Sequence, residues 1–139
     1  MSLYRIAIVA SEYNTVIMDR LIDGARRALK DQKEVRLIRV PGSFEVPFAA
    51  KAVATSKKYD AVVALGCVLR GETPHFEYIS TAVSHALQQV ALETGVPVAF
   101  GILTVDTVQQ AMDRSGDSGN KGAEAAITAL AMIDVLHKI

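Results

Sequence analysis

The sequence has 139 residues, of which 50% are apolar and 22% are charged, with 15 basic and 15 acidic side chains. This length and composition predict one folded globular domain over residues 1–139 and exclude an intrinsically disordered chain. A net charge of zero provides no basic field, so we expect neither nucleic acid nor an anionic membrane surface as a partner.

Apolar runs of strand length alternate along the chain with longer stretches of helical periodicity. In chain order the pattern predicts a strand at 4–10, a helix at 14–30, a strand at 35–40, a helix at 45–57, a strand at 60–68, a helix at 74–94, a strand at 96–104, and helices at 107–115 and 120–138. This alternation requires parallel strands joined by right-handed crossovers, with helices on both faces. We therefore predict a flavodoxin-like α/β fold, a three-layer αβα sandwich whose four-stranded parallel sheet has the order 2-1-3-4.

The helix at 120–138 has an unusual distribution of charge. From Gly122 onward its only Asp, Glu, Lys or Arg residues are Glu124, Asp134 and Lys138. A helix that is apolar nearly all round must be covered on more than one side, and a four-stranded sheet covers one. We expect a second copy of the chain to supply the remaining cover, which predicts a homo-oligomer.

Cys67 is the single cysteine, and it lies inside an apolar run. It has no partner for an internal disulfide and no neighbouring ligands for a metal site, so we interpret it as a small buried apolar residue. No metal site is predicted. No apolar run approaches the roughly 20 residues of a membrane span, and the first residues lack the pattern of a signal peptide. We therefore expect a cytoplasmic protein.

Open parallel sheets bind ligands outside the carboxyl ends of their strands, where the strand order reverses. In the predicted order this point lies between the first and third strands. Unusual residues follow the strands here: EYN (12–14) follows the first, PGSFEVP (41–47) the second and RGETPH (70–75) the third, while Phe100 lies near the end of the fourth. We expect these stretches to form the site.

The turn RGETPH has a structural and a functional interpretation. Thr73 fits a helix N-cap and Pro74 the first helical position, which would explain both residues by capping alone. His75 then lies in the first turn of the helix, where the dipole favours a neutral ring that can accept a proton. The free N–H groups of residues 71–73 make a natural phosphate site. The position at a strand end favours catalysis for His75, whereas His85 faces outward and is assigned no chemistry.

Two other stretches also leave alternatives open. PGSFEVP is either a capped helix start with Phe44 in the core, or a site where Phe44 packs on a flat ligand ring and Glu45 meets polar ligand atoms. Arg114 and Lys121 flank the loop SGDSGN and are either solvated charges or, for the arginine, a bidentate phosphate ligand.

Taken together, the segments EYN, VPGSFEVPFAA, YDAVVALGCVLRGETPHFEYIS, GVPVAFGILT and AMDRSG…GNKGAEAA resemble lumazine synthase, a family of riboflavin biosynthesis. The resemblance covers nearly the whole chain in the same order. It implies that the chain joins a pyrimidine, 5-amino-6-(ribitylamino)uracil, to a sugar phosphate, 3,4-dihydroxy-2-butanone 4-phosphate, without a metal or redox cofactor. The implied steps are Schiff base formation, loss of phosphate, ring closure and dehydration.

The resemblance also implies roles for individual residues. His75 looks like the acid/base histidine of the family, and Tyr13 and Phe44 like its pyrimidine-contacting aromatics. The other implied substrate-binding residues are Asn14, Ser43 and Glu45 beside the aromatics, Cys67, Val68 and Leu69 along the pyrimidine and ribityl pocket, Glu72 and Thr73 in the butanone-phosphate turn, Arg114 at the phosphate, Lys121 near the site, and Phe100 contributed by a neighbouring subunit.

The family places its sites between adjacent subunits of a pentamer, and this implies a pentamer here. The sequence departs from the family in three places. Tyr13 stands where phenylalanine is common, Ser118 stands in a shortened loop where many members have a further lysine, and the N-terminus lacks the longer arm that helps many members form sixty-subunit shells. A homo-oligomer that binds riboflavin or a lumazine without turnover, and a shell or scaffold, are the alternative functions.

Overall fold

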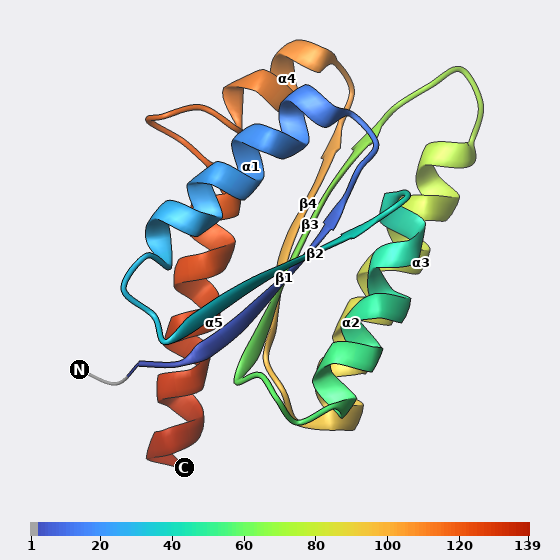
Figure 1. The fold of residues 1–139 in the computed structure, drawn as a ribbon. Coiled ribbons are helices and arrows are strands. Elements are labelled where there is room, and N and C mark those ends of the chain that lie inside the picture. The colour runs from blue at the N-terminus through green and yellow to red at the C-terminus, as the bar shows by residue number, and fades with distance from the viewer. Residues whose placement is uncertain (1–2) are drawn as a thin grey trace.

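The computed structural model describes residues 3–139 and confirms the predicted fold, a parallel sheet in the order β2-β1-β3-β4 between two helical layers (Figure 1). The strands are β1 (Arg5–Ser11), β2 (Glu34–Val40), β3 (Ala61–Leu69) and β4 (Val98–Val105). The helices are α1 (Thr15–Ala28), α2 (Val46–Thr55), α3 (His75–Thr94), α4 (Val108–Asp113) and α5 (Lys121–Lys138), with a 3-10 turn η1 (Ser43–Glu45) before α2. Helices α1, α4 and α5 lie on one face of the sheet, and α2 and α3 lie on the other (Figure 1).

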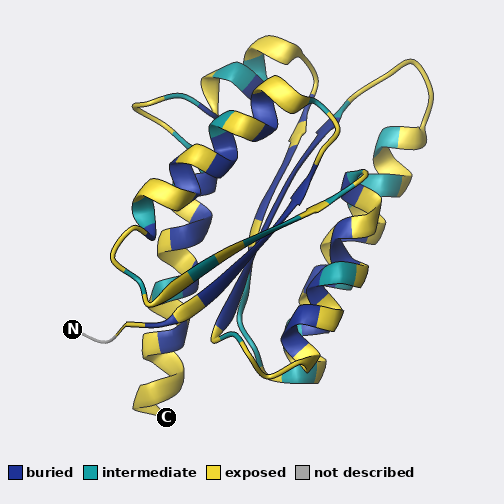
Figure 2. Cartoon of the chain, in the orientation of Figure 1, coloured by how far each residue is buried: buried dark blue, intermediate teal, exposed yellow. Residues whose placement is uncertain are grey.

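The burial of each strand follows its place in the sheet (Figure 2). Strand β3 lies between β1 and β4, and its residues 61–68 are all buried, as an apolar strand covered on both faces requires. Strand β2 is an edge strand with Arg36 and Arg39 exposed, which confirms the prediction from its two arginines.

Alternate residues of the strands build two separate cores. Ile6 and Ile8 of β1 point into the core beneath α1 and α5, whereas Ala7 and Val9 point into the core beneath α2 and α3. Each fully buried isoleucine stabilises the fold by about 1.5–3 kcal/mol, so the period of two in the sequence fixes which residues face each helical layer.

The layer formed by α1 and α5 is held by close backbone contact. A β-carbon at Gly122 would lie 2.1 Å from the backbone oxygen of Leu21, so only glycine allows α5 to approach α1 this closely. Asn120 begins α5 by accepting a hydrogen bond from the Ala123 N–H, and its amide donates to the backbone oxygen of Arg20 at 3.1 Å. One side chain therefore caps α5 and attaches it to α1.

The boundaries of the predicted elements differ from the observed ones by one or two residues, and the start of α3 corrects one interpretation. Pro74, predicted as the first helical residue, is the N-cap, because its backbone oxygen accepts the first helical hydrogen bonds, from Glu77 and Tyr78. Thr73 is therefore one residue before the cap, and its hydroxyl accepts a hydrogen bond from the His75 N–H at 3.4 Å.

One flank of α5 is apolar and exposed within this single chain. Ala125, Ala129 and Ile133 are buried toward the sheet, while Met132 and Leu136, one helical turn apart, are 43% and 46% exposed. The cover that the sequence predicted for this flank is therefore not supplied by residues 3–139. None of the helices in the same range is long and apolar enough to cross a membrane.

Candidate active site

A cleft of about 800 Å³ opens at the carboxyl ends of β1 and β3, where the strand order reverses. Its walls come from the turn after β1, from η1, from the end of β3 and from the first turns of α3. The lining residues are Tyr13, Asn14, Gly42, Ser43, Phe44, Glu45, Cys67, Val68, Leu69, Arg70, Gly71, His75, Tyr78 and Ile79. Three stretches that the sequence placed at strand ends therefore meet in one cavity.

Two aromatic rings stand open in this cleft. Tyr13 is 69% exposed and Phe44 is 60% exposed, although both line the cavity. Phe44 is thus outside the core, and the interpretation of PGSFEVP as a helix start with a core phenylalanine is wrong for this residue. Exposed aromatic faces beside a cavity favour a flat, apolar ligand, because stacking removes both surfaces from water.

The floor of the cleft contains a buried hydroxyl without a partner. Ser43 is 7% exposed, and its Oγ makes no hydrogen bond with any group in residues 3–139. A buried hydroxyl left in this state costs free energy, and a polar ligand atom in the cleft would remove that cost. Ser43 is therefore placed to bind a ligand, and it is the first residue of η1 and not its cap.

The turn after β1 is tied to the end of β3 by Asn14. This residue has left-handed backbone angles, φ 65° and ψ 57°, and its side-chain amide donates to the backbone oxygen of Cys67 at 3.4 Å. Burial raises the pKa of the Cys67 thiol above its usual value. Cys67 is buried, which confirms its interpretation as a small buried residue, and it lines the cleft with a thiol whose proton is held more tightly than usual.

Arg70 follows β3 and is already engaged by two carboxylates. Its Nε donates to Asp106 at 2.7 Å, its guanidinium forms an ion pair with Glu77, and the same group lies 4.3 Å from the ring centroid of Phe76. The hydrogen bonds that Arg70 donates to Asp106 and Glu77 raise the pKa of Arg70, and the bond accepted from Arg70 lowers the pKa of Glu77. Because Arg70 is the one basic arginine or lysine among the lining residues, the cleft of the described chain offers no unpaired cation of this kind.

His75 is the first residue of α3, and its exposed ring lines the cleft. Within residues 3–139 the ring has no hydrogen-bond partner, and neither do the backbone N–H groups of Gly71, Glu72 and Thr73. Glu72 and Thr73 lie in the exposed loop beside the cavity and are not among its lining residues. The rim thus combines a free imidazole with free amides that can bind an anion.

Three predicted residues lie away from this cleft. Phe100 is the third residue of the edge strand β4 and is 46% exposed, so its predicted place near the end of the strand is wrong. Arg114 and Lys121 lie together at the two ends of the connection between α4 and α5, where the Lys121 N–H donates to the Arg114 backbone oxygen at 2.8 Å. This connection belongs to the opposite helical layer, so one chain does not bring these residues to His75.

Four lining residues were given no role of their own from the sequence: Gly42 and Arg70, which lie within stretches expected to form the site, and Tyr78 and Ile79, which lie beyond them. Tyr78 had a usable signal, because it is three residues after His75 in a helix and therefore shares its face. Arg70 also lies in the motif, but its partner Asp106 is 36 residues away, and no local pattern relates the two.

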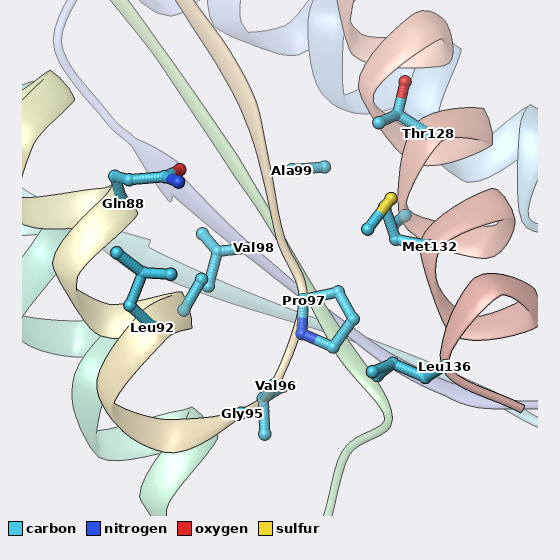
Figure 3. A pocket seen from close by; sticks show the side chains of 12 residues that line it. Gln88, Leu92, Gly95, Val96, Pro97, Val98, Ala99, Thr128, Met132 and Leu136 are labelled. Carbon is cyan, nitrogen blue, oxygen red and sulfur yellow. The ribbon is translucent and has the colours of Figure 1, made fainter. Parts of the chain in front are cut away.

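A second cavity, of about 480 Å³, lies at the opposite end of the sheet between α3, the start of β4 and α5 (Figure 3). Leu92, Pro97, Met132 and Leu136 surround it, and its lining includes no titratable side chain. Residues 3–139 also contain no group of three or more His, Cys, Asp or Glu side chains that could hold a metal ion. This second cavity therefore offers no side chain for acid–base chemistry.

Comparison with known proteins agrees with the resemblance of the motifs. Residues 3–137 match the family model described as 6,7-dimethyl-8-ribityllumazine synthase. The chain is also 48% identical over 140 residues to the 6,7-dimethyl-8-ribityllumazine synthase of Syntrophus aciditrophicus (strain SB), in an alignment that covers 97% of this chain and 91% of that protein. The chain therefore belongs to the 6,7-dimethyl-8-ribityllumazine synthase family, an enzyme family of riboflavin biosynthesis.

Proposed function

We propose that this chain condenses 5-amino-6-(ribitylamino)uracil with 3,4-dihydroxy-2-butanone 4-phosphate to give 6,7-dimethyl-8-ribityllumazine, inorganic phosphate and water, in the cytoplasm. The observation that carries the proposal is the meeting of Tyr13, Phe44, Ser43 and His75 in one cleft of a chain from this family. The reaction needs no metal or redox cofactor, since each step moves protons and expels water or phosphate.

The pyrimidine is assigned to the aromatic part of the cleft. Its planar ring matches the exposed faces of Tyr13 and Phe44, and the Ser43 hydroxyl can satisfy one polar atom of the ring or of the ribityl chain. Asn14, Glu45, Cys67, Val68 and Leu69 complete this wall, and the neutral thiol of Cys67 tolerates an apolar contact.

His75 is assigned the proton transfers. The pyrimidine amine attacks the ketone carbonyl, and water leaves to form a Schiff base; phosphate is then eliminated, and the second nitrogen closes the ring with loss of water. These steps alternately require a proton acceptor and a proton donor, and a free imidazole on the rim can perform both roles. Positioning the two substrates side by side supplies a further part of the rate.

The phosphate needs a cation that this cleft does not contain. Arg70 is neutralised by Asp106 and Glu77, so the free amides at Gly71, Glu72 and Thr73 are the available donors in the same chain. We assign the missing positive charge to Arg114, with Lys121 beside it, and an extra aromatic wall to Phe100, all from an adjacent copy. The site then lies between subunits of a homo-oligomer, and we propose a pentamer.

The exposed apolar surface supports this assembly. The flank of α5 that contains Met132 and Leu136 is uncovered, and the cavity in Figure 3 lies between it and the edge strand β4. Each Å² of apolar surface that is buried contributes about 25 cal/mol of favourable free energy, which favours association of these faces. Analytical ultracentrifugation tests the proposal, and a sedimenting species with the mass of one chain would contradict it.

The activity is tested by incubating the protein with both substrates while recording lumazine fluorescence and inorganic phosphate. We expect the two products to rise together at a rate proportional to enzyme concentration. Absence of both products would contradict the proposal. Tight binding of the pyrimidine or of riboflavin in that case would identify the alternative, a homo-oligomer that binds these compounds without turnover.

A further inference from the structure

Arg70 lines the cleft beside His75, and its guanidinium is paired with the carboxylates of Asp106 and Glu77. No step of the proposed reaction uses it. We propose that Arg70 is a positioning residue, which holds the first turn of α3 so that His75 faces the bound substrates. The proposal rests on the proposed function of His75, and it adds a residue that acts through another.

Arg70 connects three elements at the mouth of the cleft. Its backbone N–H donates to the oxygen of Val105 at 2.9 Å, which fixes the end of β3 against the end of β4. Its Nε donates to Asp106 just beyond β4. The other end of the guanidinium pairs with Glu77 and lies over the ring of Phe76, and both residues are in the first turn of α3.

Apart from the packing of the partly buried Phe76 on the core, the first turn of α3 has few contacts that fix its direction. The N-cap Pro74 provides no side-chain hydrogen bond, and the contact from the His75 N–H to the Thr73 hydroxyl is long, at 3.4 Å. Residues 70–75 are all exposed, and Leu69 before them is half-buried. The planar guanidinium of Arg70 binds Asp106 and Glu77 and stacks on the ring of Phe76. It therefore fixes the orientation of the first turn of α3 relative to the sheet.

Two observations separate positioning from other roles of an arginine here. The side chains of Arg70, Glu77 and Asp106 are 46%, 50% and 60% exposed, and ion pairs this open to water contribute little to the stability of a fold. Direct phosphate binding is disfavoured as well, because one positive charge already faces two negative ones.

The first experiment compares the steady-state kinetics of Arg70→Met and Arg70→Lys with those of the unmodified protein. Methionine keeps the length of the side chain and removes both ion pairs, so we expect kcat to fall about 10-fold while KM for each substrate changes less than about 3-fold. Lysine keeps one ion pair but lacks the planar guanidinium, so we expect a kcat between those of Arg70→Met and the unmodified protein.

Arg27→Met is the matched control. Arg27 also pairs with two exposed carboxylates, Asp23 and Asp117, but it lies on α1 away from the cleft. We expect kcat to be unchanged in this variant, and the melting temperature to move as little as in Arg70→Met. A fall in kcat in both variants would overturn the proposal, since it would mean that loss of any such cluster has the same effect.

The second experiment repeats Arg70→Met in a His75→Ala background. If Arg70 acts through His75, its substitution costs nothing further once the imidazole is gone, so the double variant is as slow as His75→Ala alone. A full additional 10-fold loss in the double variant would overturn the proposal. A rise in KM for the phosphate substrate at constant kcat would do the same, by showing that Arg70 binds the phosphate itself.

A third measurement keeps the inference independent of turnover. The ring C–H signals of His75 can be assigned by NMR from their loss in His75→Ala, because the chain has only three histidines. We expect Arg70→Met to shift these signals and Arg27→Met to leave them in place. A protein that makes no product would refute the proposed reaction alone, whereas unmoved His75 signals in Arg70→Met would refute the positioning role.

Discussion

The hydroxyl oxygen of Ser43 lies 2.5 Å from the point that a β-carbon on Gly66 would occupy. A glycine inside the buried strand β3 weakens that strand, and here it leaves the space in which η1 packs against the sheet. The floor of the cleft therefore depends on a missing side chain in one element and a small, polar one in another.

Gly66→Ala is expected to lower the free energy of unfolding by about 1–3 kcal/mol, since the new methyl group overlaps the Ser43 hydroxyl and approaches Ile102 to 3.0 Å. Urea denaturation at fixed protein concentration measures the change. The double variant Gly66→Ala with Ser43→Ala removes the closest atom, so it should recover part of the loss. Equal stability of the single and double variants would show that the hydroxyl is not the obstacle.

Ser43→Ala alone should separate stability from binding. It removes a buried hydroxyl that has no hydrogen-bond partner within residues 3–139, so we expect the free energy of unfolding to rise by about 1 kcal/mol. The KM for the pyrimidine substrate should rise about 5-fold, the effect of one lost hydrogen bond. Ser80→Ala is the control, because the Ser80 hydroxyl is also buried without a partner in the described part of the chain but does not line the cleft. A rise in KM in both variants would argue against a ligand contact at Ser43.

His75→Ala should reduce kcat about 10²-fold, the contribution of general acid–base catalysis, with pyrimidine binding retained. The comparison is His85→Ala, in which an exposed histidine on the same helix is removed far from the cleft. Stopped-flow fluorescence gives the single-turnover rate, and a fluorescence titration gives the pyrimidine affinity. An unchanged rate in His75→Ala would remove this residue from the mechanism.

Subunit complementation tests whether His75 and Arg114 of different copies share a site. His75→Ala and Arg114→Met should each be slow as pure homo-oligomers. When the two proteins are unfolded together and reassembled at equal concentration, roughly a quarter of the interfaces combine an intact His75 with an intact Arg114. Activity should therefore return to about that fraction, whereas a site within one chain would stay inactive in every mixture.

The buried thiol of Cys67 predicts a specific dependence of stability on pH. Its pKa is raised in the folded chain, so the folded state holds the thiol proton more tightly than the unfolded state. This contribution is complete below the pKa of an unfolded cysteine, about 8.5, and is lost as the pH rises through the folded pKa. Between pH 7 and 10 the free energy of unfolding should fall more steeply for the unmodified protein than for Cys67→Ala. Parallel curves for the two proteins would contradict this effect of the buried thiol.

The sheet and its strand order could be predicted from the sequence because they depend on patterns within short segments of the chain. The apolar run of β3 and the arginines of β2 identify the central and edge strands, and the βαβ pattern leaves few topologies. The start of α3 was misplaced by one residue, because capping preferences locate a helix end only approximately and hydrogen bonding to the Pro74 oxygen decides it.

The site was predictable to the extent that it depends on strand ends. Tyr13, Ser43 and His75 meet because parallel strands finish at the same edge of the sheet. Pairings across long stretches of chain could not be predicted in this way: nothing local relates Arg70 to Asp106. Phe100, which the apolar run placed near the end of the fourth strand, lies near the start of β4 and away from the cleft of its own chain.

The contact between α1 and α5 has a consequence for how the protein is made. Leu21 and Arg20 receive their partners Gly122 and Asn120 from a segment about a hundred residues later in the chain. Helix α1 therefore leaves the ribosome long before α5, and its apolar face stays exposed until α5 has been made. Non-local pairings of this kind also slow folding. During synthesis, α1 is consequently the helix that we expect chaperones to protect.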